Sequence, residues 1–250
     1  MKTFLTMTTL AALLTGGPAS FGAENAGGWK FEITPYAWLA GLEGDATVNG
    51  TKTDFEKSAR DLFDAVEVGP SLRLSAAHDR FVVLGLLDTF SRSTDELAVE
   101  GLPAGGALDT DVDLMELAAG YTVDGWAEGQ TFTLAIGARK TTIEAGLTPA
   151  GGTTTRHKAD LTDPMFYVLP SMLILPSRID GLRFNPVMGV GSGDSELVYE
   201  LFPQIQYQLC DYAAARFGYR TVGYKFEGDG DGNKLNINLA GLVIGLGLTF

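Results

Sequence analysis

The sequence is poor in the side chains with which proteins form disulfides and bind transition metals. Its 250 residues include one cysteine, Cys210, and two histidines. A single thiol cannot form an internal disulfide or a cysteine-rich metal site. The chain also has no G-x-S-x-G motif and no glycine loop with the lysine that cradles a phosphate. We therefore expect no metal, no cofactor and no enzymatic activity.

Positive charge is also scarce. Eighteen Lys and Arg stand against 31 Asp and Glu, which gives a net charge of −13. Such a surface repels polyphosphate backbones, so we exclude nucleic acid as a partner.

The sequence has no apolar run long enough for a membrane-spanning helix, which needs roughly 18 residues. One short apolar run, residues 4–14, follows Lys2 and precedes a Gly-Gly-Pro break and the small residues of ASFGA. This order is typical of a secretory signal peptide, predicted over residues 1–23, with one mature domain over 24–250. The alternative is an ordinary amphipathic first helix. An exported chain without a spanning helix is either soluble or a β-barrel.

The chain is rich in glycine, with 32 residues, and in alternating sequence. In residues 29–40, apolar side chains occupy one parity, and Lys30, Glu32 and Thr34 begin the other. A period of two with one oily and one polar face predicts a strand between two different environments. Ten such segments are predicted, over 29–41, 66–78, 80–93, 110–124, 130–144, 163–176, 182–191, 195–209, 212–227 and 235–250.

The predicted connections alternate in length. Long ones cover residues 42–65, 94–109 and 145–162, and the others are mostly tight turns. Long loops on one rim and short turns on the other are typical of an outer-membrane barrel. We predict an all-β fold, a closed antiparallel transmembrane β-barrel of ten strands, with eight or twelve as alternatives.

The last strand changes parity. Leu235, Ile237 and Leu239 share one register, whereas Leu242 and Ile244 share the other. A β-bulge at Gly241 would reconcile the two and is predicted there.

Alternation alone does not say which face meets the lipid, because a soluble ligand-carrying barrel is apolar inside. Two features favour lipid outside. Aromatic residues lie near strand ends on the apolar parity, as in the girdles of membrane barrels; they are Trp29, Tyr121, Phe217 and Tyr219. Charges of both signs occupy the other parity. The soluble, secreted ligand-binding barrel stays as an alternative.

The inward parity predicts a lumen charge network. Its members are Lys30, Glu32, Glu67, Arg73, Glu116, Arg139, Glu196, Glu200, Arg216 and Arg220. Buried charges persist when they are paired or hydrated, and a ten-stranded barrel is narrow enough for side chains to fill. We expect an ion-paired plug with a structural role, or at most a narrow conduit for small solutes.

A hydrolase on the outer rim is a further alternative. It would use His157 with Asp109, Asp111 and Asp113 in a lipid A hydrolase or a protease. The simpler interpretation is that these are solvated rim charges, bridged by divalent cations to lipopolysaccharide.

Several stretches, in order along most of the chain, resemble a poorly characterised family of Gram-negative outer-membrane barrels. They include WKFEITPYAWLAGLEG at the start, MELAAGYTV, TDPMFYV and FGYRTVGYKFEG. The closing GLVIGLGLTF resembles that family's signal for the barrel-assembly machinery, carried here by Gly245, Leu246, Leu248 and Phe250. The resemblance implies an outer-membrane location and contact with membrane lipid, lipopolysaccharide and that machinery. It also implies one short helix at 58–67, in the first long loop. The family is known by its fold rather than by an activity.

Overall fold

A computed structural model describes residues 28–48, 51–57, 71–97, 106–148, 152–175, 179, 181–227 and 234–250. The strands are β1 (Lys30–Val48), β2 (Thr51–Lys57), β3 (Ser71–His78), β4 (Phe81–Leu97), β5 (Gly106–Asp124), β6 (Thr131–Thr148), β7 (Thr155–Leu173), β8 (Leu182–Phe184), β9 (Val187–Gly191), β10 (Leu197–Phe202), β11 (Gln204–Cys210), β12 (Ala213–Glu227) and β13 (Lys234–Thr249). Within these described ranges, no helix combines the length and the apolar composition needed to cross a membrane.

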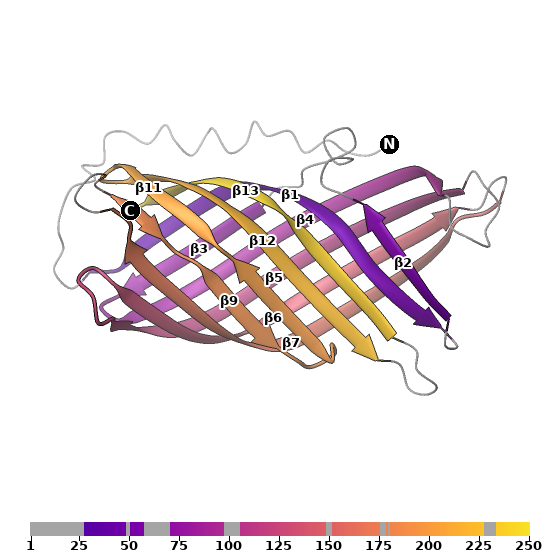
Figure 1. Cartoon of the computed structure of the whole chain (residues 1–250), viewed down its shortest axis with the longest axis horizontal. Helices are drawn as coiled ribbons and strands as arrows, with labels where there is room; N and C mark the ends of the chain where they lie inside the picture. Colours follow the sequence, from indigo (N-terminus) through magenta and orange to yellow (C-terminus); the bar gives the residue numbers. More distant parts are fainter. Residues whose placement is uncertain are drawn as a thin grey trace.

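The strands form one closed, antiparallel sheet (Figure 1). Neighbours along the chain pair from β3 to β7, β1 pairs with both β3 and β13, and β12 pairs with β10 and β11. β8 and β9 share one position in the wall, as do β10 and β11, while β2 is an extra partner of β1. The wall therefore has ten strand positions, and the predicted ten-stranded barrel is confirmed.

Prolines interrupt the two divided positions. Pro186 lies between β8 and β9, and Pro203 lies between β10 and β11. Proline has no N–H to donate, so the ladder is broken at each point. Asn185 restores one bond by donating its backbone N–H to Gln204 O at 2.9 Å.

Several strands are longer than predicted, which corrects the expected long loops. β1 and β2 pair from Leu42↔Lys57 to Val48↔Thr51, inside the predicted loop 42–65. Likewise, β4 pairs with β5 as far as Leu97↔Gly106, and β6 pairs with β7 as far as Leu147↔Thr155. Backbone pairing continues where the side chains stop alternating between oily and polar, so the alternation ends before the strands do. The predicted helix at 58–67 lies outside the described residues.

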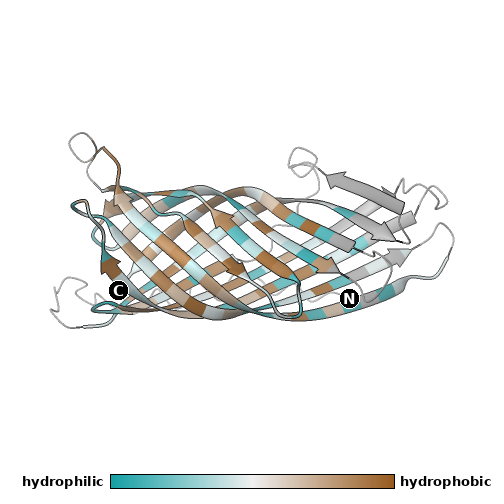
Figure 2. Cartoon of the chain, turned by 60° about the horizontal axis from the view of Figure 1, so that its bottom comes forward, coloured by the Kyte–Doolittle hydropathy of each residue, from teal (hydrophilic) through white to brown (hydrophobic). Residues whose placement is uncertain are grey.

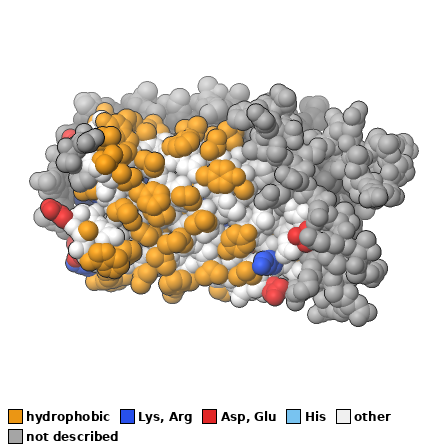
Figure 3. Space-filling model, in the orientation of Figure 1, with side chains coloured by type: hydrophobic (Ala, Val, Ile, Leu, Met, Phe, Trp, Pro, Cys, Tyr) orange, Lys and Arg blue, Asp and Glu red, His pale blue; other side chains and the backbone are white. Residues whose placement is uncertain are grey.

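The apolar parity faces outward. Ile136 is 69 % exposed and Leu117 is 65 % exposed, whereas the inward Arg139 and Arg220 are fully buried. Hydrophobic and polar residues alternate along the strands (Figure 2), and apolar side chains cover most of the described outer surface in the view of Figure 3. The four aromatic residues predicted for girdles are all exposed; they are Trp29, Tyr121, Phe217 and Tyr219.

The last strand contains no bulge at Gly241, so that prediction is wrong. Its register with β1 and with β12 runs through Gly241 without a shift. Leu239 is buried in the lumen, whereas Leu242 faces outward. The strand is oily on both parities because the lumen at Leu239 is itself apolar.

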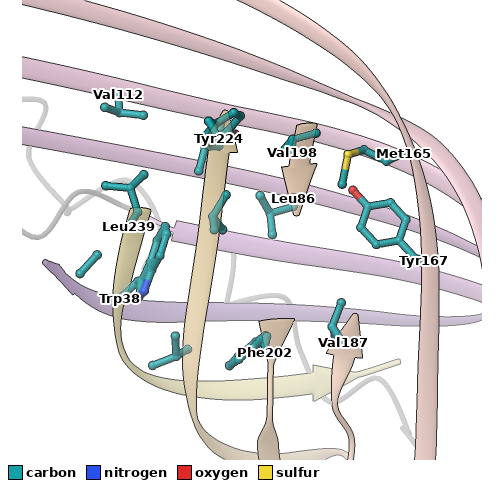
Figure 4. Close-up of a cluster of buried hydrophobic side chains, with 14 of the residues drawn as sticks. Trp38, Leu86, Val112, Met165, Tyr167, Val187, Val198, Phe202, Tyr224 and Leu239 are labelled. Carbon is teal, nitrogen blue, oxygen red and sulfur yellow. The ribbon is translucent and has the colours of Figure 1, made fainter. Parts of the chain in front are cut away.

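That apolar interior is a cluster of buried side chains inside the ring of strands (Figure 4). Trp38, Leu86, Val112, Phe202 and Leu239 come from five different strands and point into the barrel. Their presence explains why β4 is apolar on both faces: Leu86 faces the lumen and Leu87 faces outward. The lumen is a packed core rather than an empty channel at this level.

Candidate functional site

Eight polar and charged side chains meet within the apolar interior, and we call them the lumen network. They are Tyr36, Arg73, Asp88, Glu116, Arg139, Tyr167, Glu200 and Arg220. Each comes from a different strand position, so the network touches eight of the ten positions of the wall. Every member lies on the inward parity of its strand, as the pleat requires.

Glu200 of β10 is the centre of the network and is 3 % exposed. Its Oε1 accepts a hydrogen bond from Arg220 Nε at 2.9 Å, and its Oε2 accepts one from Arg139 Nη2. Arg73 Nη2 lies 3.8 Å from the same Oε1. One carboxylate therefore faces three guanidinium groups from three other strands.

Arg139 of β6 joins this centre to the β5 side of the wall. It lies directly opposite Glu116 in the β5–β6 register. Its Nε and Nη2 donate to Glu116 Oε2 at 3.0 and 2.7 Å, and Nη2 lies 3.5 Å from Tyr167 Oη. Hydrogen bonds between ionised partners are the strong ones, and they hold Arg139 in one orientation.

Arg220 of β12 joins the centre to the opposite side. Its Nη1 donates to Asp88 Oδ2 at 2.5 Å and to Tyr36 Oη at 3.2 Å, and Tyr36 in turn donates to Asp88 Oδ1. Its guanidinium lies 4.6 Å from the centroid of the Trp38 ring, within the range of a cation–π contact. Asp88 and Arg220 are 132 residues apart in sequence, so this contact ties distant parts of the chain together.

The network is electrically balanced. Arg73, Arg139 and Arg220 supply three positive charges, and the carboxylates of Asp88, Glu116 and Glu200 supply three negative ones. Burying charge is tolerable only when each ion is compensated and hydrogen-bonded. A charge-balanced set of side chains can stay buried in the low-dielectric interior without a bound counter-ion.

A separate ion pair lies toward the end of the barrel that carries the short turns and the carboxyl terminus. Arg216 Nη2 donates to Glu32 Oε1 at 2.6 Å, and Thr34 Oγ1 donates to the same oxygen at 2.9 Å. A cavity lined by Thr34, Arg73 and Arg216, among others, has a volume of about 10 Å³. That is room for about one water.

Seven of the ten predicted charge residues are paired in the lumen. Glu32, Arg73, Glu116, Arg139, Glu200, Arg216 and Arg220 take part in lumen ion pairs. Lys30 is exposed at the start of β1, and Glu67 lies outside the described residues. Glu196 is a correction: it is exposed in the turn between β9 and β10, because the strand that was expected to begin at residue 195 begins at Leu197.

Sequence reasoning missed Asp88, Tyr36 and Tyr167 as network members. Asp88 lies in a segment that is apolar on both parities, where the direction of each face could not be assigned. The available signal was that Asp88 is the lone acid in an apolar strand. An unpaired carboxylate rarely faces lipid, so this acid would be expected to face the lumen. Tyr36 was on the polar parity but carries no formal charge.

The rim residues considered for hydrolysis are not assembled into a site by the described contacts. Asp111 and Asp113 are exposed on β5 and lie opposite Glu144 and Thr142 of β6. The side chain of His157 lies outside what the structure describes. Among the described residues, no group of three or more His, Cys, Asp or Glu is arranged to hold a metal ion.

The predicted assembly signal lies where the barrel closes. Phe250 is 51 % exposed and exchanges two backbone hydrogen bonds with Phe31, at 2.8 and 3.2 Å. Leu246 is exposed on the outer face, and Leu248 has the same parity. Gly245 lies opposite Tyr36, and a Cβ at this glycine would lie 2.9 Å from the Tyr36 Cβ.

No family profile and no curated protein sequence matches this chain. Among solved structures, the outer membrane protease OmpT from Escherichia coli is similar, with a TM-score of 0.52 at 8 % identity, covering 89 % of this chain and 96 % of that chain. The attachment invasion locus protein Ail of Yersinia pestis gives a TM-score of 0.39 at 12 % identity, covering 89 % and 99 %. OprG from Pseudomonas aeruginosa gives 0.34 at 16 % identity, covering 90 % and 96 %.

At 8 % identity, the likeness to the OmpT structure shows the fold alone. The chain has the fold of an outer-membrane β-barrel.

Proposed function

We propose that this protein is an integral outer-membrane barrel whose lumen is plugged by its own side chains and whose role is structural. The lumen network is the observation that carries the proposal. It is charge-balanced, buried, and bonded across the barrel from β4 to β12 and from β6 to β10. Passage of even a small ion at this level would require these bonds to break.

The outer surface supports residence in a membrane. A monomeric soluble protein rarely exposes apolar patches larger than a few hundred Å². Here, outward side chains such as Phe81, Leu117 and Ile136 are more than half exposed on successive strands. In contact with hydrocarbon, this apolar surface is favourable. The closed barrel also pairs the backbone N–H and C=O groups of its strands with one another, as a membrane requires.

Conductance measurements test the plug against the narrow-conduit alternative. Purified protein is inserted into planar bilayers, and folding is checked by its heat-dependent shift in gel mobility. We expect the wild type to insert without steady current. The double variant Arg139→Ala/Glu200→Ala removes the central bond and is expected to conduct.

A matched control removes an ion pair that lies outside the lumen. Lys158 Nζ and Glu144 Oε1 are 2.7 Å apart, and both side chains are substantially exposed. The double variant Lys158→Ala/Glu144→Ala should stay silent. A steady current through the folded wild type would overturn the plug and favour a small-solute conduit.

A further inference from the structure

A small cavity in the lumen is lined by two arginines. Its polar lining comes from Thr34, Tyr36, Arg73, Gln204 and Arg216, and apolar residues and a glycine supply the rest. No carboxylate is among the described residues that line it. Both charged groups at this space are therefore cations, although the chain as a whole carries a net charge of −13.

The cavity exists because a glycine interrupts a row of long side chains. Gly245 of β13 lies opposite Arg216 on one side and opposite Tyr36 on the other. Its neighbours Ile244 and Leu246 are exposed on the outer face, so the bare position of Gly245 faces the lumen. No side chain from β13 therefore fills the space between Arg216 and Tyr36.

Arg216 has a hydrogen-bond donor without an acceptor. Its Nη2 donates to Glu32 Oε1 at 2.6 Å, but its Nε is buried and makes no hydrogen bond to any described residue. Buried polar atoms without a partner are rare in native proteins, and a bound water or ion is a common reason for one. The Nε atom therefore indicates that the cavity holds an acceptor.

Arg73 has donors to spare as well. It joins the lumen network through a distance of 3.8 Å to Glu200 Oε1, which is too long for a hydrogen bond. That carboxylate already accepts hydrogen bonds from Arg139 and Arg220. The side chain of Arg73 is also 15 % exposed, whereas those of Arg139 and Arg220 are 0 % exposed. Arg73 is thus the least tightly held arginine of the network, and it can turn toward an acceptor in the cavity.

We propose that the cavity binds one chloride ion, which accepts hydrogen bonds from Arg216 Nε and from Arg73. Guanidinium groups only donate, so an anion satisfies both of them, and its attraction to two cations is strong away from bulk water. The volume of about 10 Å³ admits one particle of the size of water, which excludes phosphate, sulfate and carboxylate groups. A halide is the anion of that size.

The ion is an addition to the lumen network rather than a part of it. The network is charge-balanced without it, so chloride should raise the stability of the barrel but should not be required for folding. The proposal goes beyond the structural plug and does not depend on it, because the site can be occupied whether or not the barrel conducts.

Bromide locates the ion directly, because it replaces chloride and has a strong anomalous X-ray signal. The refolded wild type is crystallised from detergent in sodium bromide, and the anomalous map should show one peak between Arg73 and Arg216. A map with water alone in the cavity would overturn the site.

Thermal unfolding in detergent tests the role of Arg73. At equal ionic strength, sodium chloride in place of sodium gluconate should raise the unfolding midpoint of the wild type by about 2–4 °C. Arg73→Met removes the donors and should abolish this rise. The matched control is Arg80→Met, which removes an exposed arginine paired with Asp124 and should keep the rise. An equal rise in Arg73→Met would overturn the role of Arg73, and if that variant does not fold, the bromide map decides.

Discussion

At the scale of single residues, the unusual feature is a carboxylate that serves three guanidinium groups. Glu200 contacts Arg139, Arg220 and, at longer range, Arg73. These arginines are already short of acceptors: Nη1 of Arg139 and Nη2 of Arg220 are buried and make no hydrogen bond to any residue that the structure describes. Removing a negative charge here leaves cations uncompensated in a low-dielectric interior.

The change Glu200→Gln tests this directly. It keeps the shape of the side chain but removes the charge, so it should lower the free energy of unfolding by about 3–5 kcal/mol, as for other broken buried ion pairs. Urea unfolding in lipid vesicles, followed by tryptophan fluorescence, measures the loss. Glu144→Gln removes a carboxylate from an exposed ion pair and should change little, because water screens exposed charges. Equal effects of the two substitutions would refute the central role of Glu200.

The sequence allowed the charged members of the network other than Asp88 to be predicted, but not how they pair. Alternation places Arg139, Glu200 and Arg220 on the inward parity of their strands. It does not reveal that Asp88 meets Arg220, since β4 and β12 are not neighbours in the wall. That contact depends on the diameter and the stagger of the closed barrel, which no local pattern encodes.

At the scale of the strands, the fold depends on close approach at particular glycines. A Cβ at Gly241 of β13 would collide with the backbone oxygen of Leu39 and would lie 2.7 Å from Ala40 Cα. Backbone atoms of a paired strand cannot move aside without breaking the ladder. At Gly241, where the sequence predicts a bulge, the strands are therefore paired tightly and regularly.

Gly241→Ala should reduce the folded yield and destabilise the barrel by about 1–3 kcal/mol or more, the usual cost of overpacking. Gly85→Ala is the matched control, because its added Cβ would have no neighbour closer than 3.6 Å. Heat-dependent gel mobility after refolding into detergent gives the folded fraction of each. Full refolding of Gly241→Ala would show that the β1–β13 pair is looser than described.

The number of strands and the direction of their faces were predictable because both follow from a period of two in the apolar belt. Strand lengths were not. Beyond the predicted ends the backbone stays paired, as at Leu97↔Gly106 and Leu147↔Thr155, although the side chains there do not alternate between oily and polar. The pattern reports the environment of a strand rather than its hydrogen bonds.

At the scale of the whole molecule, the barrel has an apolar outer surface and an interior in which apolar residues surround a balanced set of charges. This arrangement is the reverse of a soluble ligand carrier, whose outer face is polar. The account depends on hydrocarbon contacting the outward parity while the inward arginines stay shielded. The proposed plug depends on that orientation.

Spin-label accessibility tests this orientation most directly. Nitroxides are attached to single cysteines at Leu117, Ile136 and Asp111, in a Cys210→Ser background, after reconstitution into vesicles. Labels at Leu117 and Ile136 should collide more often with oxygen, which concentrates in hydrocarbon, than with a water-soluble nickel chelate. The label at Asp111 should show the opposite preference. Frequent collision of the chelate with the labels at Leu117 and Ile136 would place the apolar face in water and contradict the account.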